Sequence, residues 1–147
     1  MKHESVAALS SLDMELIEAA SDAIRRRYRY DWQEVGAAMR TRSGKVFTGV
    51  SLDAYLGRMA VCAEAVALGQ AITNAGETGI EVIVAVRHPP PEEASRAISV
   101  VSPCGACREL IWDYDRNVRV IVPGDNGPET VSIAALLPNK YSRERTL

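Results

Sequence analysis

The sequence predicts an α/β protein with a three-layer α/β/α fold around a five-stranded mixed sheet. Stretches with apolar residues at helical spacing alternate with short, nearly continuous apolar runs, a pattern typical of strands covered on both faces. The chain has 147 residues, enough for one domain with its own core. We therefore expect residues 1–147 to form a single domain, with an N-terminal helix in 1–28, a core in 29–141 and a tail in 142–147.

The first elements are a helix and a hairpin. Apolar residues recur at helical spacing over Ser11–Arg27, where Ser11 caps the start and arginines follow at the end, as the helix dipole favours. Two strands are then expected at Glu34–Thr41 and Val46–Val50. Gly44 lies between them and tolerates the positive φ of a tight turn, which predicts an antiparallel pair.

The second half alternates helices with strands. A helix is expected to begin at Cys62 and to stop before Gly76, and Ile80–Val86 is a buried strand. Residues 88–95 hold three consecutive prolines and form a loop, either a lid or a surface insertion. The remaining elements are strands at Ile98–Val101 and Val118–Val122, a helix at Cys104–Tyr114 and a short helix at Ile133–Leu137. The later strands should cross over in parallel.

Charge and composition exclude several classes of function. Lys and Arg number 17 against 19 Asp and Glu, a net charge of −2, so no long nucleic acid is expected as a partner. No apolar run exceeds five residues, so no membrane partner is expected. The three cysteines are an odd number without a secretory signal, which favours a cytoplasmic protein with free thiols.

The three cysteines fall at two expected helix starts, in Cys62-Ala63-Glu64 and Pro103-Cys104-Gly105-Ala106-Cys107. A helix N-terminus favours thiolates, and Cys104 and Cys107 share one face of a first turn. Thiolates spaced in this way suit Zn²⁺, at about 2.3 Å. Glu64 lies two residues beyond Cys62, where an ion placed past the helix end is within reach of both. The pattern predicts a metal ligand set with a base beside it.

Three alternative interpretations of the cysteines were weighed. A thioredoxin-like dithiol fits the second motif but has no use for a distant Cys-Ala-Glu. A closed structural zinc site needs a fourth ligand, for which only His3 and His88 are available. Small buried thiols without a metal are common singly, but less so as three in this pattern. We favour an open zinc site formed by Cys62, Cys104 and Cys107.

The two motifs resemble those of the cytidine deaminase superfamily, whose signature usually carries His at the first position. The resemblance extends from about Tyr30 to Tyr141, and the matching segments are Val35-Gly36-Ala37-Ala38, Lys45-Val46-Phe47-Thr48-Gly49-Val50 and Leu136-Leu137-Pro138. Cys62 in place of His points to the small-molecule branch, which holds tetrameric cytidine deaminases and blasticidin S deaminases. The resemblance implies Zn²⁺ as cofactor, a homotetramer and a catalytic core in 29–141.

The activity that the resemblance implies is zinc-dependent hydrolytic deamination of a small aminated heterocycle, with Glu64 as catalytic residue moving protons between water, ring and leaving amine. Cytidine or deoxycytidine is the first expected substrate. The alternatives are a blasticidin S deaminase-like enzyme, a deaminase of a non-nucleoside N-heterocycle and, more distantly, a non-catalytic zinc-stabilised module. Arg108 matches a family arginine and is a candidate for hydrogen-bonding the cysteine sulfurs, or is simply a surface residue. The family's arginine after the glutamate is replaced by Ala65.

The expected substrate pocket departs from the family pattern. The family's Asn-x-Glu ribose contact is replaced by Ser51-Leu52-Asp53, and a phenylalanine near the base is replaced by Gln33. Trp32 and Tyr141 are stacking candidates, or ordinary packing residues. A wider and more polar pocket is expected, and its full set of substrate-binding candidates is Ser51, Asp53, Ala63, Gln33, Trp32 and Tyr141.

Overall fold

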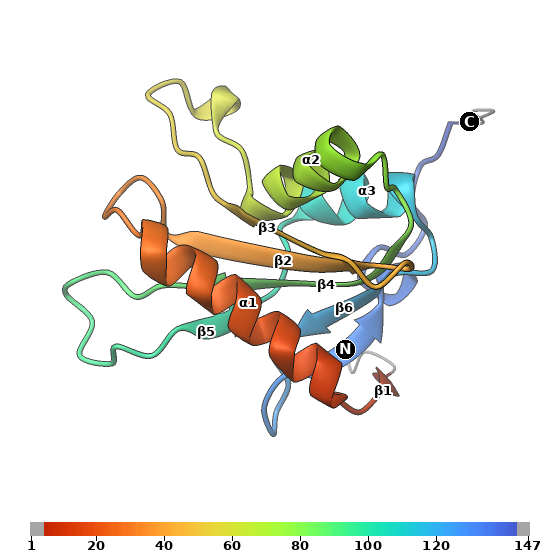
Figure 1. Ribbon diagram of the computed structural model, residues 1–147, viewed down its shortest axis with the longest axis horizontal. Coiled ribbons are helices and arrows are strands. Elements are labelled where there is room, and N and C mark those ends of the chain that lie inside the picture. Colours follow the sequence, from red (N-terminus) through yellow and green to blue (C-terminus); the bar gives the residue numbers. More distant parts are fainter. Residues whose placement is uncertain (1–4, 144–147) are drawn as a thin grey trace.

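The computed structural model describes residues 5–143 and confirms a mixed α/β fold (Figure 1). Its helices are α1 (Ser11–Arg27), α2 (Ala63–Ala75) and α3 (Gly105–Tyr114), with 3₁₀ helices at Gly57–Met59 and Ile133–Leu136. The strands are β1 (Ser5–Ala7), β2 (Val35–Thr41), β3 (Val46–Val50), β4 (Ile80–Arg87), β5 (Ser99–Val101), β6 (Arg119–Val122) and β7 (Glu129–Ser132). None of the helices in this part of the chain has the length and apolar character needed to cross a membrane.

The strands form one sheet in the order β1-β7-β6-β4-β2-β3, with β5 paired to β4 on the edge that β6 also uses. β2 pairs antiparallel with both β3 and β4, and β4 pairs parallel with β6, so β3, β4 and β6 share one direction. The expected hairpin is confirmed, and so is the parallel crossover from β4 to β6. The expectation was wrong for β5, which pairs antiparallel with β4 because the proline-rich loop turns the chain straight back along that strand. The sheet has seven strands where five were expected, because β1 and β7 are short and lack the apolar run that marks β4.

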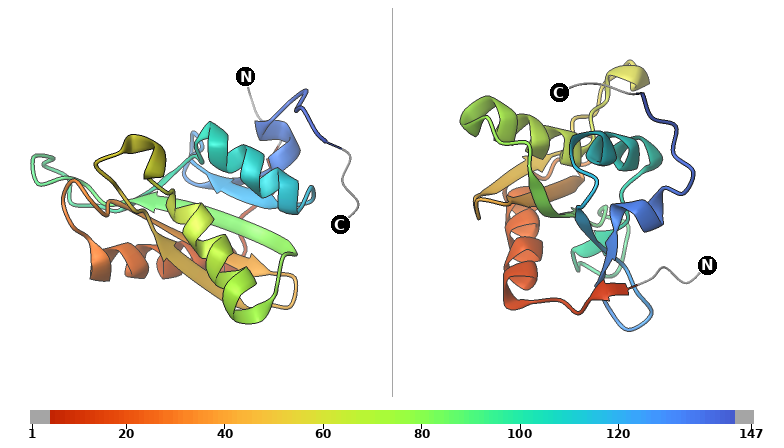
Figure 2. Two further views of the ribbon diagram at one scale, coloured as in Figure 1. Left: turned by 90° about the horizontal axis from the view of Figure 1, so that it is seen from above. Right: turned by 90° about the vertical axis from the view of Figure 1, so that its right-hand side faces the viewer.

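Helices cover both faces of the sheet, as Figure 2 shows. Alternate residues of β4 explain why: Val82, Val84 and Val86 pack with α1, while Ile83 packs with α2 and α3. Successive strand side chains point to opposite faces, so a strand between two helical layers is apolar at nearly every position. The middle layer is therefore buried from both sides.

The start of α1 differs from the expectation by one residue. Ser10, not Ser11, is the N-cap: its hydroxyl accepts from the backbone N–H of Asp13, and the Asp13 carboxylate accepts in return from the backbone N–H of Ser10. Asp13 is completely buried and also accepts from Arg40 and Arg119. This buried network holds α1 to the sheet on the face opposite α2.

Close contact between α2 and the sheet depends on a glycine of β3. A methyl group added at Gly49 would lie 2.6 Å from the backbone nitrogen of Ala67 and 2.7 Å from the carbonyl oxygen of Ala63. Any larger residue would therefore push α2 off the sheet. The same helix begins with Ala63-Glu64, so this contact also sets the position of the candidate base.

Three loops gather at one end of the molecule. They are the turn after α1 (residues 28–34), the segment 51–61 before α2, and the connection 88–98 between β4 and β5 (Figure 1). The last of these is the expected proline-rich loop, and it has no helix or strand of its own. This end of the protein carries the candidate site.

Candidate active site

The three cysteine sulfurs converge between the starts of α2 and α3. Their Sγ atoms all lie within 4.8 Å of one another, and those of Cys62 and Cys104 are 3.5 Å apart. Sulfurs bound at about 2.3 Å to one tetrahedral zinc ion are ~3.8 Å apart, so the cluster fits that ion closely. The three residues that the sequence singled out from two distant motifs are thus brought together.

Helix N-termini position two of the sulfurs. Cys62 is the N-cap of α2, and Cys104 is the N-cap of α3, where its Sγ accepts from the backbone N–H of Cys107 at 3.4 Å. The unpaired N–H groups and the dipole of each helix favour negative charge at this point. Burial opposes the ionisation of Cys104, but the N–H of Cys107 and the neighbouring thiols lower its pKa overall.

Cys107 has the opposite character. It is only 3% exposed, and its burial, with Glu64 nearby, raises the pKa of its thiol far above the usual range. Burial also raises the pKa of Cys62. A divalent cation reverses this preference because it binds the thiolate form directly. The donor set therefore fits zinc: three clustered sulfurs, two of them at helix N-termini.

Glu64 lies in the first turn of α2 and is 5% exposed. Its burial raises the pKa of the carboxyl group, while hydrogen bonds from its own backbone and from the Cys107 thiol oppose the rise. A buried carboxyl next to a metal position is placed to move protons, and a purely structural zinc site has no need of it.

A cavity of about 250 Å³ opens beside the metal position, with Cys62 in its wall. Trp32, Ser51 and Asp53, three of the expected substrate residues, line it as well. Its complete lining is Asp31, Trp32, Glu34, Val35, Ser51, Leu52, Asp53, Ala60, Val61 and Cys62. Asp31, next to Trp32, and Glu34, two residues after it, were not among the expected substrate residues.

Ser51 has a structural task in this wall. Its hydroxyl oxygen accepts from the backbone N–H groups of Glu34 and Val35 at 3.3 and 3.2 Å. With its oxygen so engaged, Ser51 retains its proton to donate to a ligand. Asp53 accepts from the backbone N–H of Ala54 at 2.7 Å and stays exposed.

Three of the expected substrate residues lie elsewhere. Ala63 is completely buried in the hydrophobic core, so its methyl group does not face the cavity. Gln33 pairs through its backbone with Arg29 and is not part of the lining. Tyr141 is 79% exposed and lines a separate cavity between α3 and the C-terminal segment. Within one chain, Tyr141 is not brought to the metal position.

Arg108 does not hydrogen-bond the sulfurs in the described structure. Its Nε donates to the carbonyl oxygen of Pro103 at 2.9 Å, and its Nη1 donates to that of Leu136 at 3.2 Å. The residue ties the segment just before Cys104 to the 3₁₀ helix at Ile133–Leu136. The expected contact with sulfur is thus replaced by one that fixes the backbone leading into the metal site.

Three clustered cysteine thiols, a buried carboxyl group beside them and an adjoining cavity are the parts that the active site of a zinc-dependent hydrolase requires. Comparison with known proteins agrees: residues 10–122 match the model of the cytidine and deoxycytidylate deaminase zinc-binding region. The chain is 44% identical over 135 residues to a blasticidin-S deaminase from Bacillus cereus, covering 92% of this chain and 96% of that relative. It is 28% identical to a cytidine deaminase from Sporosarcina psychrophila, covering 90% and 94%.

Solved structures give the same result. The crystal structure of cytidine deaminase from Burkholderia pseudomallei matches with a TM-score of 0.70 at 27% identity, covering 90% of this chain and all of that one. The chain therefore belongs to the cytidine and deoxycytidylate deaminase family, and it is a zinc-binding deaminase, a hydrolase of C–N bonds. The resemblance seen in the sequence is confirmed, and so are the fold, the activity class and the cofactor that it implied.

Proposed function

We propose that this protein deaminates the cytosine ring of a nucleoside, releasing ammonia. The observation that carries the proposal is that Cys62 is shared: its sulfur belongs to the metal cluster, and its side chain lines the cavity with Trp32 and Ser51. A ring stacked in that cavity would present its amine-bearing carbon to the metal position.

Cys62, Cys104 and Cys107 would hold Zn²⁺, which would make a water molecule acidic enough to lose a proton near neutral pH. Glu64 accepts that proton and gives it to the ring nitrogen next to the reacting carbon. A second proton passes through the same carboxyl group to the leaving amine, so water and the amine are converted to a ring carbonyl and ammonia. Trp32 offers a flat apolar surface for the base, and Ser51 a hydrogen-bond donor.

Two substrates are candidates within this class. Cytidine and deoxycytidine follow from the similarity to cytidine deaminases at 27–28% identity. The relative at 44% identity is named a blasticidin-S deaminase, which makes blasticidin S the second candidate. The pocket favours blasticidin S over cytidine, because both side chains at the family's ribose contact are changed. The oxygen of Ser51 is bound to the backbone, and Asp53 is shorter than the family's glutamate.

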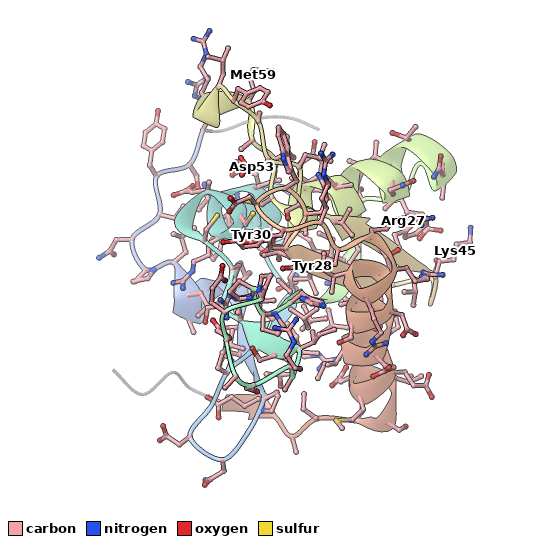
Figure 3. All side chains as sticks on the ribbon, turned by 90° about the vertical axis from the view of Figure 1, so that its left-hand side faces the viewer. Arg27, Tyr28, Tyr30, Lys45, Asp53 and Met59 are labelled. Atoms are coloured by element: carbon pink, nitrogen blue, oxygen red, sulfur yellow. The ribbon has the colours of Figure 1, made fainter. Side chains whose placement is uncertain are left out.

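We further propose a cytoplasmic homotetramer. The segment 51–61 leaves Tyr55 95% exposed and Leu56 and Met59 each more than 60% exposed. Met59 lies at the outer edge of the molecule in Figure 3. A neighbouring copy would cover these side chains. Light scattering should then give about four times 16.0 kDa. All three cysteines are free thiols, and Cys104 is exposed, which suits a reducing compartment.

The test is a substrate panel of cytidine, deoxycytidine and blasticidin S, with ammonia release and the loss of cytosine absorbance as readouts. We expect turnover of at least one, with blasticidin S the best. Glu64→Gln should lower kcat by at least about a thousandfold while zinc content stays at one ion per chain. The matched control is Glu15→Gln, an exposed glutamate on α1. Absence of ammonia from every cytosine compound, or full activity of Glu64→Gln, would refute the proposal.

A further inference from the structure

The proline loop (residues 88–98) lies against the turn that forms one wall of the cavity. We call that turn, residues 28–34, the wall turn; it contributes Asp31, Trp32 and Glu34 to the lining. Tyr28 and Tyr30, at the start of the wall turn, lie at the end of the molecule seen in Figure 3. Nothing in the metal chemistry requires the proline loop, so its contacts with the wall turn call for another explanation.

Three contacts join the two segments. The backbone N–H of His88 donates to the carbonyl oxygen of Glu34 at 2.8 Å. The rings of Tyr28 and His88 stack with centroids 3.7 Å apart and planes 16° from parallel. The hydroxyl of Tyr30 donates to Glu92 at 2.8 Å. The proline loop thus contacts the wall turn at both of its ends.

The stack is what fixes Tyr28. Its hydroxyl oxygen is buried and has no hydrogen-bond partner among the described residues. A buried phenol without a partner is costly, so the ring stays in place because of its apolar contacts. His88 provides the parallel face, and its Nδ1 lies 2.8 Å from the carbonyl oxygen of Pro89.

The wall turn is tight. Backbone hydrogen bonds between Arg29 and Gln33 close it, and Asp31 adopts a φ of 62°. Aspartate tolerates this left-handed conformation better than most residues do, so the turn can form at this position. Its hydrogen bonds close the turn on itself, whereas the contacts with the proline loop hold it relative to the sheet. Asp31, Trp32 and Glu34 are the residues that the turn presents to the cavity.

The proline loop is itself well anchored. Both of its ends are held in the sheet, since β5 returns to pair with β4. Arg96 donates to the carbonyl oxygen of Pro90 at 2.7 Å within the loop. The ion pair of Arg87 and Glu93 is exposed to solvent and adds little to this anchoring. Consecutive prolines restrict the backbone between these points. A loop held in this way resists displacement and is suited to support its neighbour.

We propose that the proline loop is a brace that holds the wall turn in its substrate-binding shape, with His88 and Glu92 as positioning residues for the nucleoside. The inference deepens the proposed function and rests on it. Because neither residue touches the metal cluster, loss of the brace should weaken substrate binding and leave zinc and the proton transfers intact. Loss of the brace should therefore raise KM and leave kcat nearly unchanged.

The first experiment removes the stack. His88→Ala should raise KM about threefold to tenfold and change kcat less than twofold, while His88→Phe, which restores an aromatic face, should return KM to near the original value. Zinc content is measured alongside. If His88→Ala leaves KM unchanged, or if His88→Phe is as impaired as His88→Ala, the stack does not position the wall.

The second experiment tests the Tyr30 contact. Glu92→Ala should raise KM by a few fold, and Glu92→Gln, which keeps an oxygen acceptor for the Tyr30 hydroxyl, should raise it less. The matched control is Glu93→Ala: it removes an ion pair within the same loop that does not reach the wall turn, so KM should stay unchanged. An equal rise in KM for Glu93→Ala would show a general loosening of the loop and would overturn the brace.

A third measurement separates the brace from the proposed function. The amides of Trp32 and Gln33 are hydrogen-bonded to the carbonyl of Arg29, and hydrogen–deuterium exchange of this peptide should become faster in His88→Ala and not in Glu93→Ala. If the wild-type protein turns over no cytosine compound, the proposed function fails, yet exchange still decides on the brace. Unchanged exchange in His88→Ala would refute it.

Discussion

Buried charge decides the behaviour of individual residues in this protein. Cys107 and Glu64 are 3% and 5% exposed and lie close enough for each to affect the ionisation of the other. Three thiolates and Zn²⁺ together carry a charge of −1, and the Glu64 carboxylate adds another. The N-termini of α2 and α3 offset part of this charge, as does the direct hydrogen bond from the N–H of Cys107 to Cys104.

Zinc removal should therefore destabilise the whole protein, because the ion binds the folded state alone. A ligand at a thousand times its dissociation constant contributes ~4 kcal/mol, which for a chain of this length corresponds to a fall in Tm of about 10 °C on chelation. Calorimetry with and without a chelator measures it. Cys107→Ser should lose most of its zinc and most of this response; a Tm that is indifferent to the chelator would contradict the metal site.

Asp13 gives the clearest pH dependence. Burial disfavours its charge, but hydrogen bonds from Arg119, the N–H of Ser10 and Arg40 lower its pKa from 3.8 to about 2. A pKa that is lower in the folded than in the unfolded state stabilises the fold above pH ~4, and this contribution is lost as the pH falls towards 2. The loss amounts to about 2 kcal/mol.

Urea unfolding at pH 5 and pH 3 tests this expectation. Asp13→Asn should lower the free energy of unfolding at pH 5 by about 3 kcal/mol, because the buried Arg40 loses its partner, and its stability should depend less on pH than that of the wild type. Asp22→Asn, which changes an exposed carboxylate on the same helix, serves as the control. Equal pH dependence in Asp13→Asn and wild type would be inconsistent with a lowered pKa.

Among the elements, α2 matters most because the proposed ligand Cys62 is its N-cap and the proposed base Glu64 lies in its first turn. Its contact with β3 is closer than any side chain would permit at Gly49. Position and chemistry are therefore coupled: whatever moves α2 outward also moves Cys62 and Glu64 away from α3.

A pair of glycine substitutions isolates this coupling. Gly49→Ala should lower the free energy of unfolding by about 1–3 kcal/mol and weaken zinc binding, since the added methyl group meets the backbone of α2. Gly69→Ala lies on α2 itself, where nothing is within 4 Å of the added group, and should stabilise by about 0.5–1 kcal/mol. Zinc titration and urea unfolding report both quantities. If Gly49→Ala left the zinc affinity unchanged, the contact between α2 and β3 would not position the metal site.

For the molecule as a whole, the distribution of charge matters more than its net value of −2. Asp31, Glu34 and Asp53 line the cavity, and among its described lining residues there is no Lys, Arg or His. A partly enclosed cavity with one sign of charge concentrates the field, so a substrate carrying a phosphate group should be disfavoured.

Deoxycytidine and deoxycytidylate make a matched pair for this test. At low salt we expect kcat/KM, or competitive inhibition of a better substrate, to favour deoxycytidine by at least about tenfold. Added salt, or Asp53→Asn, should narrow the difference because both weaken the negative field. If deoxycytidylate bound as tightly as deoxycytidine, these carboxylates would not act on the ligand.

The predictions from sequence succeeded where the signal is local. The alternation of apolar residues located α1, β4 and the helices after Cys62 and Cys104, and Gly76, with a φ of 63°, ends α2 as expected. They fell short at β7, where Val131 is the single apolar residue of Glu129–Ser132 and the strand forms by pairing with β6 and β1. The partners of Arg108 could not be predicted because they are carbonyl groups, which leave no trace in a residue pattern.

The sequence alone predicted the three cysteines as metal ligands and Glu64 as the base, and it indicated the family, since thiols at the starts of two helices and a nearby carboxylate are properties of residue type and spacing. Only the tertiary structure decided which surfaces face the ligand. It turned the Ser51 hydroxyl oxygen toward the β2 backbone, placed Asp31 and Glu34 in the cavity wall, and set the proline loop behind that wall. These outcomes depend on contacts between segments far apart in the chain, and such contacts form only when the packed core fixes where each loop emerges.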